Sequence, residues 1–257
     1  MHTMTVTGLS AAAFSSHGPL QKPLLHEISF ELAAQERVAL IGHSGAGKSL
    51  TLLSLLGLAP TAIQVQGRIR YAHTDYELQQ TSTLATFRGK IASLLPQDAK
   101  ASLDPVYRVA AQLKEVIRHR ERTNPTRQEL ADRLKQVELE PACLDLYPFE
   151  LSGGMAQRVS LALAFANRPS ILFADEPYSA LDSPTRSRLL TTLKEYCDRS
   201  SCALLFVSHD LYSVSTLCHR VLVLDQGRIV EQQDTSALLR TPQHPITTQI
   251  IAAARKQ

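Results

Sequence analysis

The fold class of this chain is indicated first by one motif, Gly42-His43-Ser44-Gly45-Ala46-Gly47-Lys48-Ser49. It has the pattern GxxxxGK[ST], it follows an apolar run, and it precedes residues that favour a helix. Its glycines allow backbone N–H groups to approach phosphate oxygens, and the N-terminus of the following helix adds partial positive charge. Lys48 is then placed to reach the β- and γ-phosphates of a nucleotide, and the Ser49 hydroxyl to hold Mg²⁺. The stretch therefore predicts a nucleotide-phosphate site at the end of a buried strand.

Short apolar runs alternate with helical patterns on both sides of this motif. The runs are residues 38–41, 91–95, 171–174, 203–207 and 221–224. Helices are predicted over residues 48–56 and 106–119, and Asn124 with Pro125 predicts the N-cap and first residue of another. Strands that alternate with helices indicate a mainly parallel sheet with helices on both faces. The helical middle of the chain predicts a subdomain inserted into this α/β core.

Composition limits the classes of function. The chain has 257 residues and a net charge of +3, which is too small to indicate nucleic-acid binding. Aromatic residues make up 5% and Trp is absent, which argues against a base-stacking surface. The hydrophobic share of 44% excludes a disordered chain, and the four scattered cysteines predict reduced thiols rather than a disulfide framework. We expect no signal peptide and no membrane span, so any membrane role requires a partner.

A second motif is Ile171-Leu172-Phe173-Ala174-Asp175-Glu176, which is four apolar residues followed by two acids. Asp175 would end a buried strand, where α/β sheets place their ligands, and would bind Mg²⁺ directly or through water. Glu176 would polarise the attacking water. The alternative is a strand that ends in a solvated acidic turn. The phosphate motif in the same chain favours the first interpretation.

The stretch Leu151-Ser152-Gly153-Gly154-Met155-Ala156-Gln157 lies between these two motifs and resembles the LSGGQ-type signature of ATP-binding-cassette (ABC) ATPases. Ser152 is a good N-cap, and Gly153 and Gly154 allow backbone amides to face a phosphate. The resemblance implies that this phosphate belongs to ATP on the opposite subunit, so that two chains enclose two nucleotides. Met155 and Ala156 depart from the pattern, which has Gln directly after the glycines.

The resemblance implies roles for four further positions, with ATP and Mg²⁺ as cofactors. Gln97 matches the Q-loop glutamine, which senses Mg²⁺ and contacts the membrane partner. Residues 179–182 match the D-loop, which contributes Asp182 to the nucleotide site. His209 matches the switch histidine, which contacts the γ-phosphate. Phe14 is the candidate adenine platform, and the alternative for it is an ordinary core phenylalanine. Pro96 and Tyr178 replace the residues usual at their positions without removing a catalytic group.

The resemblance covers essentially the whole chain and implies its architecture. We expect an α/β fold with a P-loop NTPase (RecA-like) core, an N-terminal antiparallel β-subdomain and an inserted α-helical subdomain. Residues 1–96 and 167–257 would form the nucleotide-binding core, and residues 97–166 the inserted helical signature subdomain, all within one ABC ATPase domain.

Three stretches resemble the dipeptide, oligopeptide and nickel importer branch of this family. Residues 97–105 resemble QDPxxSLNP, residues 146–155 resemble LYPxxLSGGM, and residues 241–247 resemble P-x-H-P-Y-T. Ala99, Asp104 and Ile246 are departures from these patterns. The last cysteine is Cys218, so we expect no iron–sulfur site of the kind that the Cys-rich tails of longer members resemble. The short form is most similar to the nickel and metallophore type.

The branch resemblance implies the ATP-hydrolysing subunit of a bacterial importer for nickel, a metal–metallophore complex or small peptides. Its expected place is the cytoplasmic face of the cell membrane, as a peripheral subunit. The expected partners are two transmembrane permease subunits, a second ABC ATPase in a heterodimer or homodimer, and indirectly an extracytoplasmic substrate-binding protein. No nucleic acid is expected among the partners.

Other ABC ATPases are the alternatives. A soluble accessory ATPase of a metabolic complex, such as those of carbon–phosphorus lyase systems, would co-purify with enzymes rather than membrane subunits. A DNA-repair or chromosome-organising ATPase would carry a long coiled coil, and the stretch between Lys48 and Ser152 is too short for one. A resistance or translation type would need two cassettes, and only one phosphate motif is present.

Overall fold

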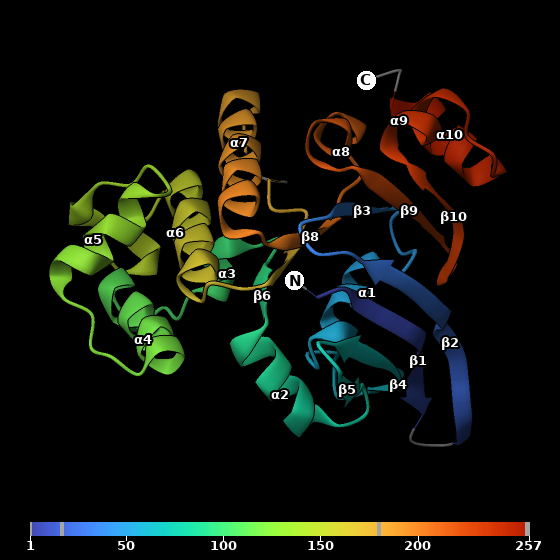
Figure 1. Cartoon of the computed structure of the whole chain (residues 1–257), viewed down its shortest axis with the longest axis horizontal. Helices are drawn as coiled ribbons and strands as arrows, with labels where there is room; N and C mark the ends of the chain where they lie inside the picture. The colour runs from blue at the N-terminus through green and yellow to red at the C-terminus, as the bar shows by residue number, and fades with distance from the viewer. Residues whose placement is uncertain (1, 16–17, 179–180, 255–257) are drawn as a thin grey trace. The chain divides into compact units, whose positions relative to one another are not determined.

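The computed structural model describes residues 2–15, 18–178 and 181–254, and it describes no side chain for residues 14–22 (Figure 1). The chain divides into two compact units. The first comprises Met1–Arg88 and Ala203–Gln257, and the second comprises Gly89–Cys202. The expected division into a nucleotide-binding core and an inserted helical subdomain stays a prediction.

The first unit contains a four-stranded antiparallel sheet with the order β2-β1-β4-β5. Its strands are β1 (Met4–Ser15), β2 (Gly18–Leu32), β4 (Ile63–Tyr71) and β5 (Thr74–Glu77). In β2 the buried residues Ile28, Phe30 and Leu32 alternate with exposed ones, which is the period of a strand with one face in the core. This sheet is the antiparallel β-subdomain that the resemblance implies.

The first unit also contains strands β3 (Arg37–Ile41), β8 (Ala203–Val207), β9 (Arg220–Asp225) and β10 (Arg228–Asp234). β3 pairs in parallel with β8 and with β9, and β10 is antiparallel to β9. Every residue of β3 and β8 is buried. Continuous apolar runs are typical of parallel strands that are covered on both faces, which is why sequence alone located β3, β8 and β9. β10 is not among the strands predicted from the sequence.

Several helices belong to the first unit. They are α1 (Lys48–Leu55), α2 (Thr81–Lys90), α8 (Leu211–Leu217), α9 (Thr235–Arg240) and α10 (Pro245–Ala254). α1 starts directly after the phosphate motif and ends one residue before its predicted end. Gly57 then has φ +65°, where a side chain would be strained and its Cβ would lie 2.9 Å from the Leu84 Cβ.

The second unit combines two parallel strands with a group of helices. The strands are β6 (Ala92–Leu95) and β7 (Ile171–Asp175). The helices are α3 (Ala99–Ser102), α4 (Val109–Glu121), α5 (Arg127–Lys135), the 3₁₀ turns η1 (Pro141–Asp145) and η2 (Pro148–Glu150), α6 (Gly153–Ala166) and α7 (Ser183–Ser200). Figure 1 shows α4, α5 and α6 side by side. Leu113, Leu134 and Val159, one from each of these helices, are buried.

Two predicted helix starts are wrong. α4 begins at Val109 rather than at residue 106, because Asp104 Oδ1 accepts a hydrogen bond from the Val106 N–H in a turn (3.1 Å). α5 has Thr126 as its N-cap rather than Asn124. Thr126 Oγ1 accepts from the Glu129 N–H, and the Glu129 carboxylate accepts from the Thr126 N–H. This capping box satisfies two backbone donors at once, so it sets the start of the helix.

The cysteines and the lengths of the helices can be compared with the expectations from composition. Cys143, Cys197, Cys202 and Cys218 are buried and form no disulfide, as their scattered positions predict. Over residues 2–15, 18–178 and 181–254, no helix combines the length and apolar character that crossing a membrane requires.

Candidate nucleotide-binding site

The phosphate motif forms a tight loop between β3 and α1 in the first unit. The Ala46 N–H donates to the His43 carbonyl oxygen (3.1 Å), and His43, Ser44 and Gly45 are exposed at the apex. Gly47 has φ +105°, and a Cβ there would lie 2.6 Å from the Leu25 Cδ2. Only glycine fits such a position, which explains why the motif requires one directly before the lysine.

Lys48 is the first residue of α1, and its side chain turns back into the loop. Its Nζ donates to the carbonyl oxygens of Gly42 and His43, each at 3.0 Å. The residue is only 8% exposed, so the ammonium is held inside the loop. Ser49 follows in the first turn of α1 and is half-buried. Backbone N–H groups at this helix start, together with Lys48, form the arrangement that binds phosphate groups.

His209 lies at the same edge of the parallel strands as the phosphate loop. β3 and β8 are in parallel register with Leu40 opposite Val207, and the Ser208 N–H donates to the Leu40 carbonyl oxygen (3.3 Å). His209 follows Ser208 directly and is exposed. The first unit therefore brings residues 42–49 and His209 together.

Asp210 fixes the segment that carries His209, and sequence reasoning missed it. Its carboxylate accepts hydrogen bonds from the N–H groups of Tyr212 and Ser213 as the N-cap of α8. Its own N–H donates to Ser208 Oγ (2.8 Å). An Asp directly before a predicted helix is an N-cap signal that would have identified it.

The second unit brings Gln97, Asp175 and Glu176 to one edge of its strand pair. β6 and β7 are parallel, with Leu95 opposite Ala174. Gln97 follows β6, Asp175 ends β7 at 9% exposure, and Glu176 comes next. Glu176 has φ +40°, in the left-handed region that residues with side chains adopt at a cost. Such strain is common where a catalytic side chain is held in place.

The signature stretch forms the exposed start of α6. Ser152 is the N-cap, and its Oγ accepts from the Met155 N–H (3.2 Å). Gly153 and Gly154 are the first two helical residues, and a Cβ at Gly153 would meet no heavy atom within 4 Å. Their N–H groups are among the four that an α-helix leaves without an intrahelical partner. The geometry thus suits an anion, as the sequence predicts.

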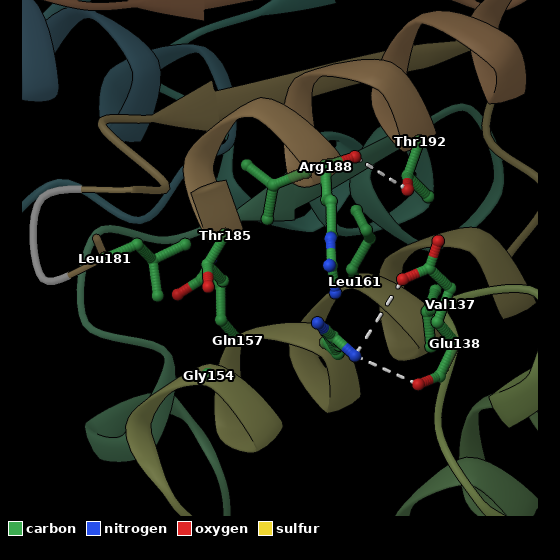
Figure 2. Close-up of a pocket in the computed structure, with 11 residues that line it drawn as sticks. Val137, Glu138, Gly154, Gln157, Leu161, Leu181, Thr185, Arg188 and Thr192 are labelled. Atoms are coloured by element: carbon green, nitrogen blue, oxygen red, sulfur yellow. Dashed lines mark hydrogen bonds and ion pairs between the residues drawn. The ribbon is translucent and has the colours of Figure 1, made fainter. Parts of the chain in front are cut away.

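Asp182 is the N-cap of α7, close to the start of α6. Its Oδ1 accepts from the Thr185 N–H (2.8 Å), and the Thr185 side chain and backbone together hold the pKa of this carboxyl below its usual range. Figure 2 shows Thr185 and Leu181 facing Gly154 across a pocket between the two helices. A Cβ at Gly154 would lie 3.9 Å from the Thr185 Cγ2. Residues 179 and 180 of the predicted D-loop lie outside the described residues.

The predicted residues fall into two groups, one in each unit. Residues 42–49 and His209 belong to the first unit. Gln97, Ser152, Gly153, Gly154, Asp175, Glu176 and Asp182 belong to the second. Phe14 has its backbone in β1, and its side chain is outside the described part of the chain, so its role stays a prediction.

Each group, taken by itself, contains atoms of the kinds that bind nucleotide phosphates or a metal ion. Hydroxyl, carboxylate and amide oxygens, as on Ser49, Asp175 and Gln97, are the ligands that Mg²⁺ prefers. The loop N–H groups and the Lys48 ammonium match the charge and shape of phosphate groups.

Comparisons with known proteins identify the family of the chain. The family described as "ABC transporter" matches residues 25–179. The chain is 35% identical over 236 residues to the probable D,D-dipeptide transport ATP-binding protein DdpD of Escherichia coli, covering 90% of this chain and 72% of that protein. It is 33% identical over 241 residues to the metal-staphylopine import system ATP-binding protein CntD of Staphylococcus aureus, covering 91% and 88%.

One solved structure has the same fold. The dimeric post-hydrolysis state of the ATP-binding cassette MJ0796, bound to ADP and Pi, superposes with a TM-score of 0.77 at 24% identity. The match covers 90% of this chain and 98% of that one.

Proposed function

The chain belongs to the ABC transporter family as an ATP-binding and ATP-hydrolysing cassette, and on that premise we propose that it powers an importer for nickel, a metal–metallophore complex or small peptides. The observation that supports this most strongly is the match to CntD, which extends over 91% of this chain and 88% of that protein. DdpD supports the peptide alternative. In this proposal the cassette drives transport without touching the transported molecule, so each of these substrate classes fits the chain.

The phosphate loop would bind the triphosphate. Lys48 leaves its carbonyl partners Gly42 and His43 and neutralises phosphate charge, while N–H groups of residues 43–49 donate to phosphate oxygens. His209, at the same edge of the strands, contacts the γ-phosphate. In this proposal the loop neutralises phosphate charge, and the residue after the end of β8 recognises the γ-phosphate.

Glu176 would orient the attacking water as a general base, and Gln97 would sense the γ-phosphate. Ser49, Asp175 and Gln97 would hold Mg²⁺, which when bound neutralises the charge that develops on the phosphate oxygens. Asp175 is suited to this because its carboxylate ends a buried strand, where the low dielectric strengthens its interaction with a cation.

Two cassettes would enclose the nucleotides. Ser152, Gly153 and Gly154 present the start of α6 to the γ-phosphate of ATP bound by a second cassette, and Asp182 lies beside them. The second cassette is either a different ABC ATPase or another copy of this chain. The two cassettes would close when they bind ATP and open after hydrolysis, and this movement would drive transport.

The remaining partners are proposed from the same family membership. Residues 97–166, as the helical signature subdomain, would push on the coupling helices of two transmembrane permease subunits. The subunit would lie on the cytoplasmic face of the membrane and serve an extracytoplasmic substrate-binding protein indirectly. Residues 1–96 and 167–257 would form the nucleotide-binding core.

A tagged pull-down from native membranes, followed by mass spectrometry, tests this function. Recovery of two polytopic membrane proteins and a second ATPase is the expected result. Those subunits would then be tested for transport of nickel, metallophore and dipeptide. Recovery in the soluble fraction alone, with metabolic enzymes as companions, would contradict the importer and favour an accessory ATPase.

A further inference from the structure

The turn between β9 and β10 is hydrogen-bonded to two separate parts of the first unit. The Gly227 N–H donates to the carbonyl oxygen of Ala46 in the phosphate loop (3.1 Å). The Gly227 carbonyl oxygen accepts from the N–H of His26 in β2 (2.8 Å). One glycine therefore ties the phosphate loop to an outer strand of the antiparallel sheet.

The backbone at Gly227 leaves no space for a side chain. It is buried and has φ +75°, and a Cβ there would lie 2.2 Å from the Leu24 carbonyl oxygen. The same Cβ would lie 3.0 Å from the Leu25 Cα. Both contacts are with backbone atoms of β2, which cannot move away as the end of a flexible side chain can.

The phosphate loop also lies close to β9, the strand that leads into this turn. A Cβ at Gly42 would lie 2.2 Å from the carbonyl oxygen of Leu224 in β9. A Cβ at Gly47 would lie 2.6 Å from the Leu25 Cδ2 and 3.5 Å from the Leu224 Cδ2. The loop is thus packed between β2 on one side and β9 with its turn on the other.

We propose that Gly227 is a positioning residue for nucleotide binding, because its turn clamps the phosphate loop to β2. Phosphate recognition needs loop N–H groups that are aimed before the ligand arrives, and a loop fixed at both Gly42 and Ala46 meets this need. The inference rests on the proposed role of residues 42–49 in binding ATP. It adds that β2 and the β9–β10 turn respond when the loop is filled.

The variant Gly227→Ala tests the clamp, and Gly8→Ala is its matched control. Gly8 has φ +63°, so alanine is strained there in the same way, but its Cβ would meet no heavy atom within 4 Å. Calorimetric titration with MgATP should give a Kd raised at least about tenfold for Gly227→Ala and within about twofold of wild type for Gly8→Ala. Equal affinities for wild type and a folded Gly227→Ala variant would overturn the proposal.

Two further readouts separate positioning from general damage. Because Gly227 touches no reacting atom, Gly227→Ala should raise KM for ATP while kcat at saturating ATP stays within about twofold of wild type. Gly227→Asn tolerates the left-handed backbone better than alanine but keeps the close approach to Leu24, so it should bind MgATP as weakly as Gly227→Ala. Wild-type affinity in Gly227→Asn would contradict the close approach.

Hydrogen exchange on the unaltered protein covers the case in which the Gly227 variants do not fold. MgATP should slow exchange of the His26 and Gly227 amides together with those of residues 43–49. Protection of the loop without any change at His26 and Gly227 would overturn the clamp and leave the proposed ATP site intact. Absence of protection in the loop itself would instead contradict the proposed function.

Discussion

Leu95 of β6 and Ala174 of β7 are opposite each other in a parallel strand pair. Gln97 lies two residues beyond the first and Asp175 one residue beyond the second, so both reach the same edge although they are far apart in sequence. Parallel strands place their carboxyl ends together, and this edge is where α/β proteins bind ligands. The register therefore accounts for the proximity of Gln97 to Asp175 and to Glu176, which follows Asp175 directly.

Gly47→Ala should destabilise the protein more than Gly45→Ala. Both glycines have positive φ, at +105° and +80°, but only a Cβ at Gly47 has a close neighbour, the Leu25 Cδ2 at 2.6 Å. We expect a loss of about 1 kcal/mol in the free energy of unfolding for Gly45→Ala. Gly47→Ala should lose about 1–3 kcal/mol more, because overpacking adds to the strain. Urea unfolding measures both, and equal losses would show that Leu25 yields without cost.

Ser152→Ala should weaken the start of the signature helix. It removes the oxygen that accepts the Met155 N–H at 3.2 Å, and the loss of an N-cap costs about 1 kcal/mol. Ser152→Thr retains an oxygen and should keep most of the stability. Thermal unfolding of the two variants is the measurement, and a Ser152→Ala protein as stable as wild type would contradict the cap.

Glu231→Gln should alter the acid limb of the stability profile. Burial raises the pKa of Glu231, but hydrogen bonds from the Thr247 hydroxyl and from the N–H groups of Gln243 and His244 outweigh it and leave the pKa below its usual range. With the folded pKa below the unfolded value of about 4.3, this stabilisation is present above that value and is lost as pH falls through the folded pKa.

The measurement for Glu231 is urea unfolding between pH 7 and pH 3. Glu231→Gln should lose about 2 kcal/mol at pH 7 and depend less steeply on pH than wild type in the acid range. Glu140→Gln, at an exposed position, is the control and should follow the wild-type profile. A Glu231→Gln profile parallel to wild type would show that the Glu231 carboxylate does not fasten α10 to β10.

Lys48→Ala should abolish tight nucleotide binding. It removes the ammonium that the loop holds at 3.0 Å from two carbonyl oxygens and that would pair with phosphate. We expect Kd for MgATP to rise at least about tenfold, as for other losses of a charge-assisted contact. Lys194→Ala, at an exposed position in α7, should bind MgATP as wild type does. Equal Kd values for the two variants would remove Lys48 from the site.

The sequence predicts the elements that are determined by residues close together in the chain. The fully buried strands β3 and β7 are short apolar runs bounded by charged, Gly or Ser residues, and the run of β8 ends at Ser208. The phosphate loop has its glycines in the motif itself. The predicted start of α5 is wrong because two N-terminal signals lie next to each other in the sequence, and the prediction used the weaker one. The capping box from Thr126 to Glu129 satisfies more donors than the Asn124–Pro125 pair.

Other features depend on residues that are distant in sequence. Gly227 is an ordinary turn glycine in the sequence, and only the position of Leu24 and His26 in the fold shows why no side chain fits. No sequence motif marks Glu231 either, because its hydrogen-bond partners Gln243, His244 and Thr247 reach it only when α10 packs against β10. Sequence patterns contain no direct signal for such contacts.

Turnover of the Glu176→Gln variant is the decisive measurement for the proposed role of Glu176 as the general base in ATP hydrolysis. Phosphate release from MgATP should fall at least about 100-fold, in the range that removal of a general base costs, while Kd for MgATP stays near wild type and an ATP-bound dimer accumulates. Glu195→Gln, at an exposed position in α7, should turn over at the wild-type rate. Hydrolysis by Glu176→Gln at the wild-type rate would show that Glu176 is not the general base.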